Sequence, residues 1–245
     1  MEKKDNFSKQ ADLYAKYRPE YPDELYQFIF SKVKRFDTAW DCATGNGQAA
    51  KVLAAHFTHV EATDISAKQI ENAFPIDNIH YSVQIAEKTF FENHSFDLIT
   101  VAQALHWFKF DDFFNEVKRV LKPDGVFAAW CYGLNSVDPE IDEITQHFYR
   151  DIVGPFWDKE RTHIEKKYES IAFPFPEIVS RDFYYNAEWS ADEYLGYLGT
   201  WSSVQHYIKN KNSNPIELIS QSIIDKWGRN KRTVTFPIHL KLVCL

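Results

Sequence analysis

The sequence predicts an α/β protein built on a doubly wound, mostly parallel sheet, and three observations favour this fold class. Between residues 37 and 133, short apolar runs alternate with amphipathic segments, which is typical of βαβ units. The first apolar run leads straight into a glycine-containing turn and then into a helical segment. A hydrophobic share of 44% in 245 residues is that of a well-cored globular protein. We therefore expect one sheet-centred core with a cap.

The elements of the core follow in order along the chain. Residues 22–30 read as a helix with Asp23 near its start and apolar residues at helical spacing. Five strands are expected, at residues 38–42, 59–64, 79–85, 96–102 and 125–132. Three helices are expected between them, at residues 48–57, 67–74 and 111–121. The Lys122-Pro-Asp-Gly125 turn ends the last of these helices and starts the fifth strand.

After Gly133 the apolar spacing becomes helical, and two further strands are separated by helices. The strands are expected at residues 178–189 and 232–244, and the helices at residues 190–207 and 215–227. Because proline has no N–H to donate, we expect a bulge or an unpaired position at Pro237. The chain thus reads as one domain over residues 1–245. Its parts are a core (37–133, 178–189 and 232–244), an N-terminal lid (1–22) and a helical cap (137–170 and 190–228).

Charge and cysteine content exclude several classes of function. The 28 Lys and Arg residues against 35 Asp and Glu residues give a net charge of −7, which disfavours binding to nucleic acid or to an anionic membrane. Three widely spaced cysteines cannot form a disulfide framework or a local metal site. No run of about 18 apolar residues occurs, and no apolar leader follows the first residue. We expect a cytoplasmic protein with a small-molecule partner and no bound metal.

The turn after the first strand carries the ligand-binding pattern. Gly45 and Gly47 let the backbone approach a ligand, and Asp64 follows Gly45 by 19 positions, where a carboxylate can bind both hydroxyls of an adenosine ribose. The pattern Gly45-x-Gly47-x-x-Ala50 also fits a dinucleotide site. Asp41 argues against a dinucleotide, because its charge would oppose a pyrophosphate but attract a ligand that carries an ammonium and a sulfonium.

Several motifs together resemble a known family. They are Asp41-x-Ala43-x-Gly45-x-Gly47, Ala62-Thr-Asp64-Ile-Ser, Ala86-Glu87 with the run from Ser95 to Phe108, and Val117-x-Arg119 through Gly125. This set resembles the class I S-adenosylmethionine-dependent methyltransferases, which have a Rossmann-like sheet of seven strands, the seventh antiparallel. The opening Tyr14-x-x-Tyr17-Arg18-Pro-x-Tyr21-Pro22 and the Gln103-Ala-Leu-His-Trp-Phe108 run resemble the branch that includes trans-aconitate methyltransferase.

The resemblance implies S-adenosylmethionine as cofactor and assigns residues to it. The implied cofactor-binding residues are Asp41, Ala43, Thr44, Gly45, Asn46, Gly47, Asp64, Ile65, Ala86, Glu87 and Gln103. Asp41 and the turn would lie against the methionine end, Asp64 would hold the ribose, and Gln103 would close the methionine side. Ala43 stands where the family has glycine and is expected to take a negative φ. Ile85 stands where an acidic residue is common, so Glu87 or backbone would meet the adenine.

Methyl transfer from a sulfonium is an in-line displacement that needs little chemistry from the protein beyond orientation. We expect a small-molecule acceptor with a carboxylate or hydroxyl, of which a carboxylate needs no general base. His106 is the candidate catalytic base, although a packing role beside Trp107 is the simpler interpretation. Candidate substrate-binding residues are Tyr14, Tyr17, Arg18, Tyr21, Trp107, Tyr132 and Trp201. Arg150 and Arg161 could bind an acidic acceptor but could equally be solvated surface residues.

Two other functions stay open at this point. One is an NAD(P)-dependent oxidoreductase on a similar sheet, against which Asp41 and the lack of a second nucleotide-binding half argue. The other is a non-catalytic protein that binds S-adenosylmethionine, for which the sequence holds no positive feature.

Overall fold

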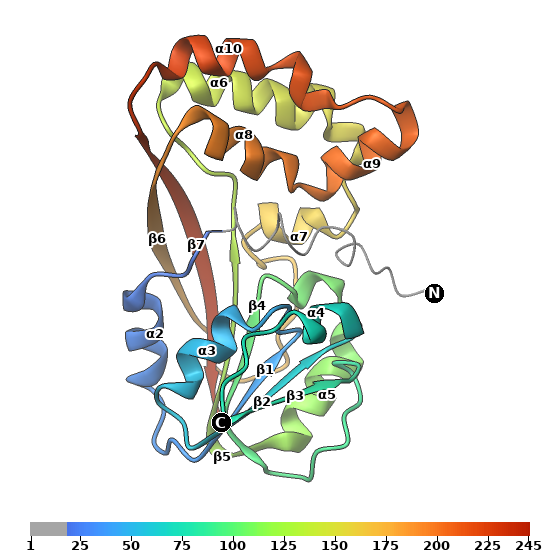
Figure 1. The fold of residues 1–245 in the computed structure, drawn as a ribbon. Helices are drawn as coiled ribbons and strands as arrows, with labels where there is room; N and C mark the ends of the chain where they lie inside the picture. The colour runs from blue at the N-terminus through green and yellow to red at the C-terminus, as the bar shows by residue number, and fades with distance from the viewer. Residues whose placement is uncertain (1–18) are drawn as a thin grey trace.

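The computed structural model describes residues 19–245 and contains a seven-stranded sheet with the order β3-β2-β1-β4-β5-β7-β6 (Figure 1). Strands β1 to β5 run parallel, and β7 runs antiparallel to both of its neighbours, β5 and β6. The strands are β1 (Thr38–Cys42), β2 (His59–Asp64), β3 (Ile79–Val83), β4 (Phe96–Ala102), β5 (Leu121–Tyr132), β6 (Val179–Trp189) and β7 (Arg232–Cys244). The predicted α/β fold with an antiparallel last strand is confirmed.

Helices cover both faces of the sheet and extend beyond one end of it (Figure 1). One face packs against α2 (Asp23–Phe30) and α3 (Gln48–Ala54), and the other against α5 (Phe110–Val120). The short α4 (Ala67–Glu71) follows β2. The remaining helices are α6 (Pro139–His147), α7 (Arg161–Glu165), α8 (Ala191–Gly199), α9 (Ser202–Lys211) and α10 (Ser220–Trp227). Of these, α6, α8, α9 and α10 lie together beyond one end of the sheet, and the long strands β6 and β7 extend toward them (Figure 1).

The structure corrects two details of the sequence-based elements. Residues 190–207 form two helices rather than one, because the chain leaves the helical conformation at Trp201, which turns inward and is 7% exposed. The turn before the fifth strand lies within β5, where the register with β4 shifts between Phe96 and Leu98 and Asp124 has a φ of 66°.

Of the two outcomes expected at Pro237, the structure shows the unpaired position and no bulge, because β6 pairs through Pro237 without a register shift. On the other side of β7, the pairing with β5 ends at Tyr132 and Ile238. The position at which proline lacks an N–H therefore lies just beyond the end of β5 and leaves no β5 carbonyl without its donor. Of the expected lid, all but residues 19–22 lies outside the described residues.

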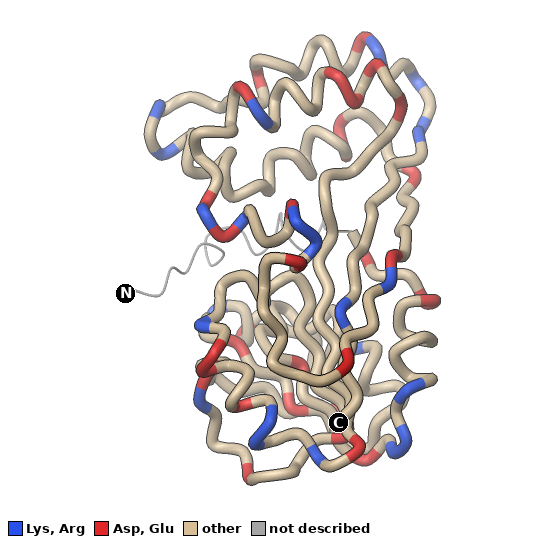
Figure 2. The backbone as a smooth tube through the Cα atoms, turned by 180° about the vertical axis from the view of Figure 1, so that it is seen from behind, with Lys and Arg blue, Asp and Glu red and all other residues tan. Residues whose placement is uncertain are grey.

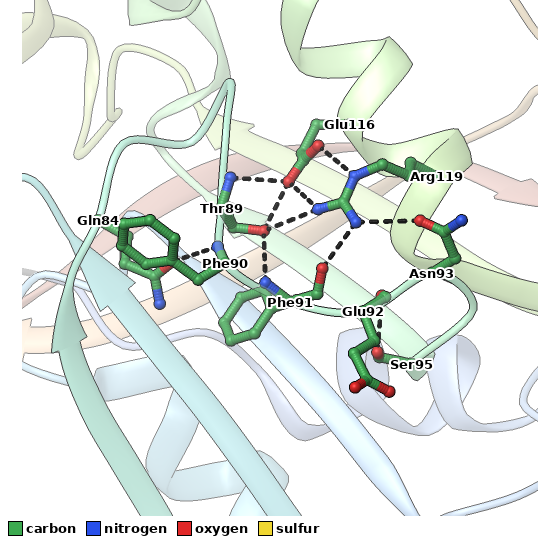
Figure 3. A network of polar contacts seen from close by, with 9 residues as sticks. All are labelled: Gln84, Thr89, Phe90, Phe91, Glu92, Asn93, Ser95, Glu116 and Arg119. Carbon is green, nitrogen blue, oxygen red and sulfur yellow. Dashed lines mark hydrogen bonds and ion pairs between the residues drawn. The ribbon is translucent and has the colours of Figure 1, made fainter.

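A polar network fixes the loop between β3 and β4 against α5 (Figure 3). Glu116 accepts hydrogen bonds from the Thr89 backbone at 2.7 Å, from the Thr89 hydroxyl at 2.5 Å and from Arg119 at 2.7 Å. Burial alone would raise the pKa of Glu116, but the bonds from Arg119 and Thr89 outweigh it and lower the pKa. Arg119 also donates to the Phe91 carbonyl at 2.6 Å, so the loop is held from several sides.

Acidic and basic residues alternate over both the sheet and the cap (Figure 2), in keeping with the modest net charge of −7. Within residues 19–245, no helix has the length and apolar character to cross a membrane.

Candidate active site

A cleft lies at the carboxyl ends of β1, β2 and β4, with an empty volume of about 980 Å³ that includes space open to solvent. Nine residues singled out from the sequence line it: Tyr21, Ala43, Thr44, Gly45, Asn46, Asp64, Ile65, Gln103 and Trp107. Seven further residues complete the lining: Gln48, Ala49, Ser66, Gln69, Ala102, Ala104 and Phe108. All seven flank the predicted ones in sequence or follow them by one helical turn, which is the signal that would have found them.

The turn after β1 is a tight reversal in which three residues take left-handed backbone angles. Ala43, Gly45 and Gly47 have φ values of 54°, 57° and 90°. The negative φ expected for Ala43 is therefore wrong. The turn is held there by Thr44, whose N–H donates to the Thr63 carbonyl at 2.9 Å and whose carbonyl accepts from Gly47 at 3.0 Å. An alanine in this region costs about 1 kcal/mol or more, which the surrounding bonds must offset.

Gly47 is required for space as well as for its backbone angle. A Cβ at this position would lie 2.4 Å from the Tyr81 hydroxyl, closer than any real contact. Gly47 thus faces Tyr81 of β3 and does not line the cleft. We expect it to affect cofactor binding through the shape of the turn.

Asp64 lies at the edge of the cleft and holds the turn in place. One of its carboxylate oxygens accepts from the Gly45 N–H at 2.9 Å and the other from the Ser66 N–H at 2.8 Å. A carboxylate oxygen can accept two hydrogen bonds, so the same group can hold the turn and a ligand hydroxyl together.

Asp41 lies beneath the turn and does not itself line the cleft, so its place against the ligand stays a prediction. It is 1% exposed and accepts hydrogen bonds from the Thr44 hydroxyl (2.5 Å), the Thr100 hydroxyl (2.7 Å) and the Ala50 N–H (3.1 Å). The last bond satisfies a donor in the first turn of α3. Burial raises the pKa of Asp41 from 3.8 to about 6 in spite of these bonds. The Asp41 carboxylate therefore lies below the floor of the cleft, out of contact with solvent.

Ala86 and Glu87 are not among the residues that line the cleft, and their contact with the cofactor stays a prediction. The Glu87 carboxylate accepts from the Lys109 N–H at 3.1 Å, and both residues belong to the loop that the Glu116 network ties to α5.

A second pocket adjoins the cleft and is roofed by the cap. Gln103 and Trp107 line both spaces, so the two meet there. The empty volume of the second pocket is about 530 Å³ and, like that of the cleft, includes space open to solvent. Its other lining residues are His106, Tyr132, Trp157, Asp158, Arg161, Ile164, Tyr197, Trp201 and Ser202. The sequence indicated His106, Trp107, Tyr132 and Trp201 but missed Trp157, Asp158, Ile164, Tyr197 and Ser202, which come from the cap.

Gln103 separates the two spaces in a strained conformation. Its φ is 56°, and its side-chain carbonyl accepts from the Tyr132 N–H at 2.8 Å. Its own N–H donates to the Trp130 carbonyl at 2.8 Å. These bonds fix the end of β4 to the end of β5, and a left-handed non-glycine residue held in this way is typical of functional sites.

The remaining predicted residues fall in different places. The His106 ring is buried, its Nδ1 lies 3.3 Å from the Tyr168 hydroxyl, and its centroid lies 4.8 Å from that of Trp107. Tyr21 contacts the cleft rather than the second pocket and packs edge-on against Trp130. The predicted residues Tyr14, Tyr17 and Arg18 lie outside the described residues. Within residues 19–245, no group of three or more His, Cys, Asp or Glu side chains could hold a metal ion.

Comparisons with known proteins agree on one family. A family model described as a methyltransferase domain matches residues 40–129. A Dictyostelium discoideum protein named as a methyltransferase is 34% identical over 247 residues, covering 97% of this chain and 94% of that protein. A solved structure from Anaeromyxobacter dehalogenans, described as a type II methyltransferase, is 36% identical, covers 93% of this chain and 98% of its own, and has a TM-score of 0.86. A phosphoethanolamine N-methyltransferase of Haemonchus contortus, solved with S-adenosylhomocysteine and phosphomonomethylethanolamine, shares the fold at 15% identity and a TM-score of 0.51, covering 95% and 57% of the two chains.

Proposed function

The chain belongs to the S-adenosylmethionine-dependent methyltransferases, and on this premise we propose that it methylates a small-molecule acceptor through a carboxylate or a hydroxyl. Its cofactor is S-adenosylmethionine, and the oxidoreductase and non-catalytic alternatives are set aside. We place it in the branch similar to trans-aconitate methyltransferase on the strength of the motifs quoted above. We also treat residues 1–245 as one domain in which the helical segments cap the acceptor site.

The cleft fits a ligand with a ribose and a positively charged end. Asp64 places a carboxylate at the cleft edge, where it would bind the ribose hydroxyls. Gly45 would let the turn approach the ligand, since a Cβ there would meet only the Gln69 side chain, at 4.0 Å. The buried carboxylate of Asp41 favours positive charge above the turn. Gly47 would act through the shape of the turn, and the predicted contacts of Asp41, Ala86 and Glu87 with the cofactor stay part of the proposal.

The acceptor is proposed to occupy the second pocket, and the carrying observation is that this pocket meets the cleft at Gln103 and Trp107. The walls of this pocket are largely aromatic, as is common in sites that bind small molecules. Tyr132, Trp157, Tyr197 and Trp201 line this space from strand β5 and the cap. Placing the acceptor there would put its nucleophilic atom next to the methionine end of the cleft.

The protein's part in the reaction is to position and to exclude water. The bound cofactor supplies a methyl group on a sulfonium with a good leaving group. The bonds between Gln103 and Tyr132 fix the passage between the two spaces, so that acceptor and cofactor meet in one orientation. Trp107 and the cap aromatics keep the passage dry. A carboxylate acceptor needs no base, in which case His106 packs the pocket wall; for a hydroxyl acceptor, His106 would receive the proton.

Calorimetric titration with S-adenosylhomocysteine and, separately, with NADH tests the cofactor first. We expect binding of S-adenosylhomocysteine and no binding of NADH. A panel of carboxylic acids, alcohols, phenols and amines, assayed by mass spectrometry for a gain of one methyl group, then tests the acceptor. Methylation confined to amines, or absent from every acid and hydroxyl compound, would contradict the proposal.

A further inference from the structure

A tyrosine from the turn after α7 is buried beside the loop that follows β4. Tyr168 is 0% exposed and lies in the core on the α5 face of the sheet. α7 packs against the short 3-10 helix η1 (Leu105–Trp107), which follows β4. In Figure 1, α7 lies between the sheet and the layer of cap helices. Tyr168 is thus placed where the cap side of the molecule meets the end of β4.

The backbone at Tyr168 is strained and is held in that state from both sides. Lys167 and Tyr168 have φ values of 52° and 60°, and two consecutive left-handed residues other than glycine persist only where neighbouring bonds enforce them. Their N–H groups donate to the carbonyls of Ile164 and His163, each at 2.8 Å, which closes the end of α7. The Lys167 ammonium donates to Asp182 of β6 at 3.2 Å. Lys167 is therefore tied to the sheet edge while the Tyr168 side chain is buried.

The Tyr168 hydroxyl lies at the start of η1. The first N–H groups of a helix have no carbonyl within that helix to donate to, and in η1 they belong to Leu105 and His106. Burial raises the pKa of Tyr168 well above its ordinary value, whereas bonds from the backbone of His106 and Leu105 act in the opposite sense. The phenolic oxygen thus accepts from the backbone of η1 and caps it from outside the helix.

The hydrogen of the same hydroxyl is directed to the His106 ring. The Nδ1 atom of His106 lies 3.3 Å from the Tyr168 oxygen. A hydroxyl has one hydrogen to donate and two lone pairs with which to accept, and the backbone of η1 occupies the lone pairs. The bond to Nδ1 therefore runs from the hydroxyl to the ring, which requires an Nδ1 without a proton. A neutral imidazole of this kind carries its proton on Nε2.

Cys131 of β5 is the competing acceptor for that hydrogen. Burial raises the pKa of the Cys131 thiol to about 12, and a bond from Tyr168 is among the smaller effects that lower it. The thiol is therefore protonated at neutral pH, and the sulfur of a protonated thiol is a weak acceptor. The imidazole nitrogen is the stronger acceptor and receives the hydrogen.

η1 also carries the side chains that form the passage between the two spaces. Trp107 lines both the cleft and the second pocket, and His106 lines the second pocket. Their ring centroids are 4.8 Å apart, so a shift of one ring displaces the other. A misplacement of about 1 Å at such a point can lower a rate about a hundredfold. Tyr168 is not among the lining residues, so it acts on the passage only through η1.

From these contacts we propose that Tyr168 is a positioning residue for methyl transfer, which holds η1 in place and sets His106 in the form that carries its proton on Nε2. This inference rests on the proposed function and decides between the two roles that the proposed function leaves to His106. In this form the ring can donate a hydrogen bond from Nε2 but cannot take up a proton there. His106 therefore orients groups at the pocket wall and is not the base.

The test compares the purified full chain with Tyr168→Phe and with a matched control, Tyr194→Phe. Tyr194 is also 0% exposed, but its hydroxyl bonds to Asn135 at 3.0 Å and to Thr145 at 2.8 Å instead of to η1. The first readout is the ¹⁵N chemical shifts of the His106 ring nitrogens at pH 8, assigned by their loss in His106→Gln. The others are kcat and KM for the best acceptor of the panel above, calorimetric binding of S-adenosylhomocysteine and thermal unfolding.

We expect the wild-type His106 to show an unprotonated Nδ1 and a protonated Nε2. In Y168F the two ¹⁵N shifts should move toward each other, because the donor that selects this form is gone. Y168F should lower kcat about ten- to a hundredfold with KM changed less than about threefold and with unchanged binding of S-adenosylhomocysteine. Y194F should lower the unfolding temperature to a similar extent but keep the wild-type shifts and kcat.

Different failures can be told apart. A proton on Nδ1 in the wild type would overturn the inference while the proposed function stands, and this measurement needs neither a variant nor an acceptor. Wild-type shifts or kcat in Y168F, or equal losses of kcat in Y168F and Y194F, would reduce the hydroxyl to a packing role and overturn it too. If S-adenosylhomocysteine binds but no acid or hydroxyl compound is methylated, the proposed function is wrong and the positioning role falls with it.

Discussion

Replacing Asp41 by asparagine should stabilise the protein at neutral pH, even though it removes a buried charge that accepts three hydrogen bonds. Burial raises the pKa of Asp41 from 3.8 to about 6. Each unit of difference corresponds to about 1.4 kcal/mol, so the charged form at pH 7 lowers the free energy of unfolding by about 3 kcal/mol relative to the protonated form. Asparagine resembles the protonated acid in charge and shape. We expect the free energy of unfolding of D41N to exceed that of the wild type by about 1–3 kcal/mol at pH 7.5. The gain is smaller than the full value because the amide NH2 group, which cannot accept a hydrogen bond, replaces one carboxylate oxygen.

The same raised pKa fixes the sign of the pH dependence, which can be measured separately from the gain at pH 7.5. The folded protein keeps the Asp41 proton between about pH 4 and pH 6, where the unfolded chain has lost it, so the wild type loses stability as the pH rises through this window. D41N lacks this slope. Urea unfolding followed by circular dichroism at pH 4.5, 5.5, 6.5 and 7.5 should show the two proteins diverging up to pH 6.5 and running parallel above it.

Asp97 is the matched control, because it is equally buried on β4 but has cationic partners. Burial alone would raise its pKa, but hydrogen bonds from Lys122 at 2.9 Å, from the Thr38 backbone at 3.0 Å and from Arg35 at 3.2 Å outweigh this and lower it. Asp97 therefore contributes stability above its unfolded pKa, which is lost as the pH falls through the folded pKa. D97N should destabilise the protein at pH 7.5. If D41N loses as much stability as D97N there, or keeps the wild-type slope, the assignment of Asp41 as a costly buried charge is wrong.

Four further outcomes concern the two spaces. D41N should weaken binding of S-adenosylmethionine more than that of S-adenosylhomocysteine, because only the former carries a sulfonium; calorimetry that finds equal losses would remove this electrostatic role. Asp64→Ala should raise the dissociation constant of S-adenosylhomocysteine at least tenfold, and an unchanged constant would mean that the ribose is held elsewhere. Gly47→Ala should lower the unfolding temperature and cofactor affinity, since its Cβ would lie 2.4 Å from the Tyr81 hydroxyl; adding Tyr81→Phe should recover part of the loss, and no recovery would place the whole cost in the φ of 90°. His106→Asn should change kcat for a carboxylate acceptor by less than about tenfold, whereas a collapse of kcat would identify His106 as a base.

The core of the site was predictable because its pattern is local. A strand, a reversal with Gly45 and Gly47, a helix and then Asp64 at the end of the next strand occupy fewer than 30 consecutive residues, and parallel strands bring such ends to one edge of the sheet. The sequence alone therefore determined the α/β fold, the position of the cleft and the cofactor. It did not reveal that Asp41 lies beneath the turn, because strand alternation does not show which neighbouring hydroxyls, here those of Thr44 and Thr100, will capture a carboxylate.

How the cap completes the second pocket depended on the tertiary structure. Trp157 and Arg161 lie more than 50 residues beyond Gln103 in the chain and reach it only because β7 inserts between β5 and β6 and the cap folds over the strand ends. Long-range pairing of this kind leaves no local periodicity in the sequence, and an arginine in a short helix reads as an ordinary surface residue until its neighbours are known. The sequence alone therefore indicated the methyl donor, S-adenosylmethionine, because its binding pattern is local. The packing of the cap decided which side chains surround the proposed acceptor site.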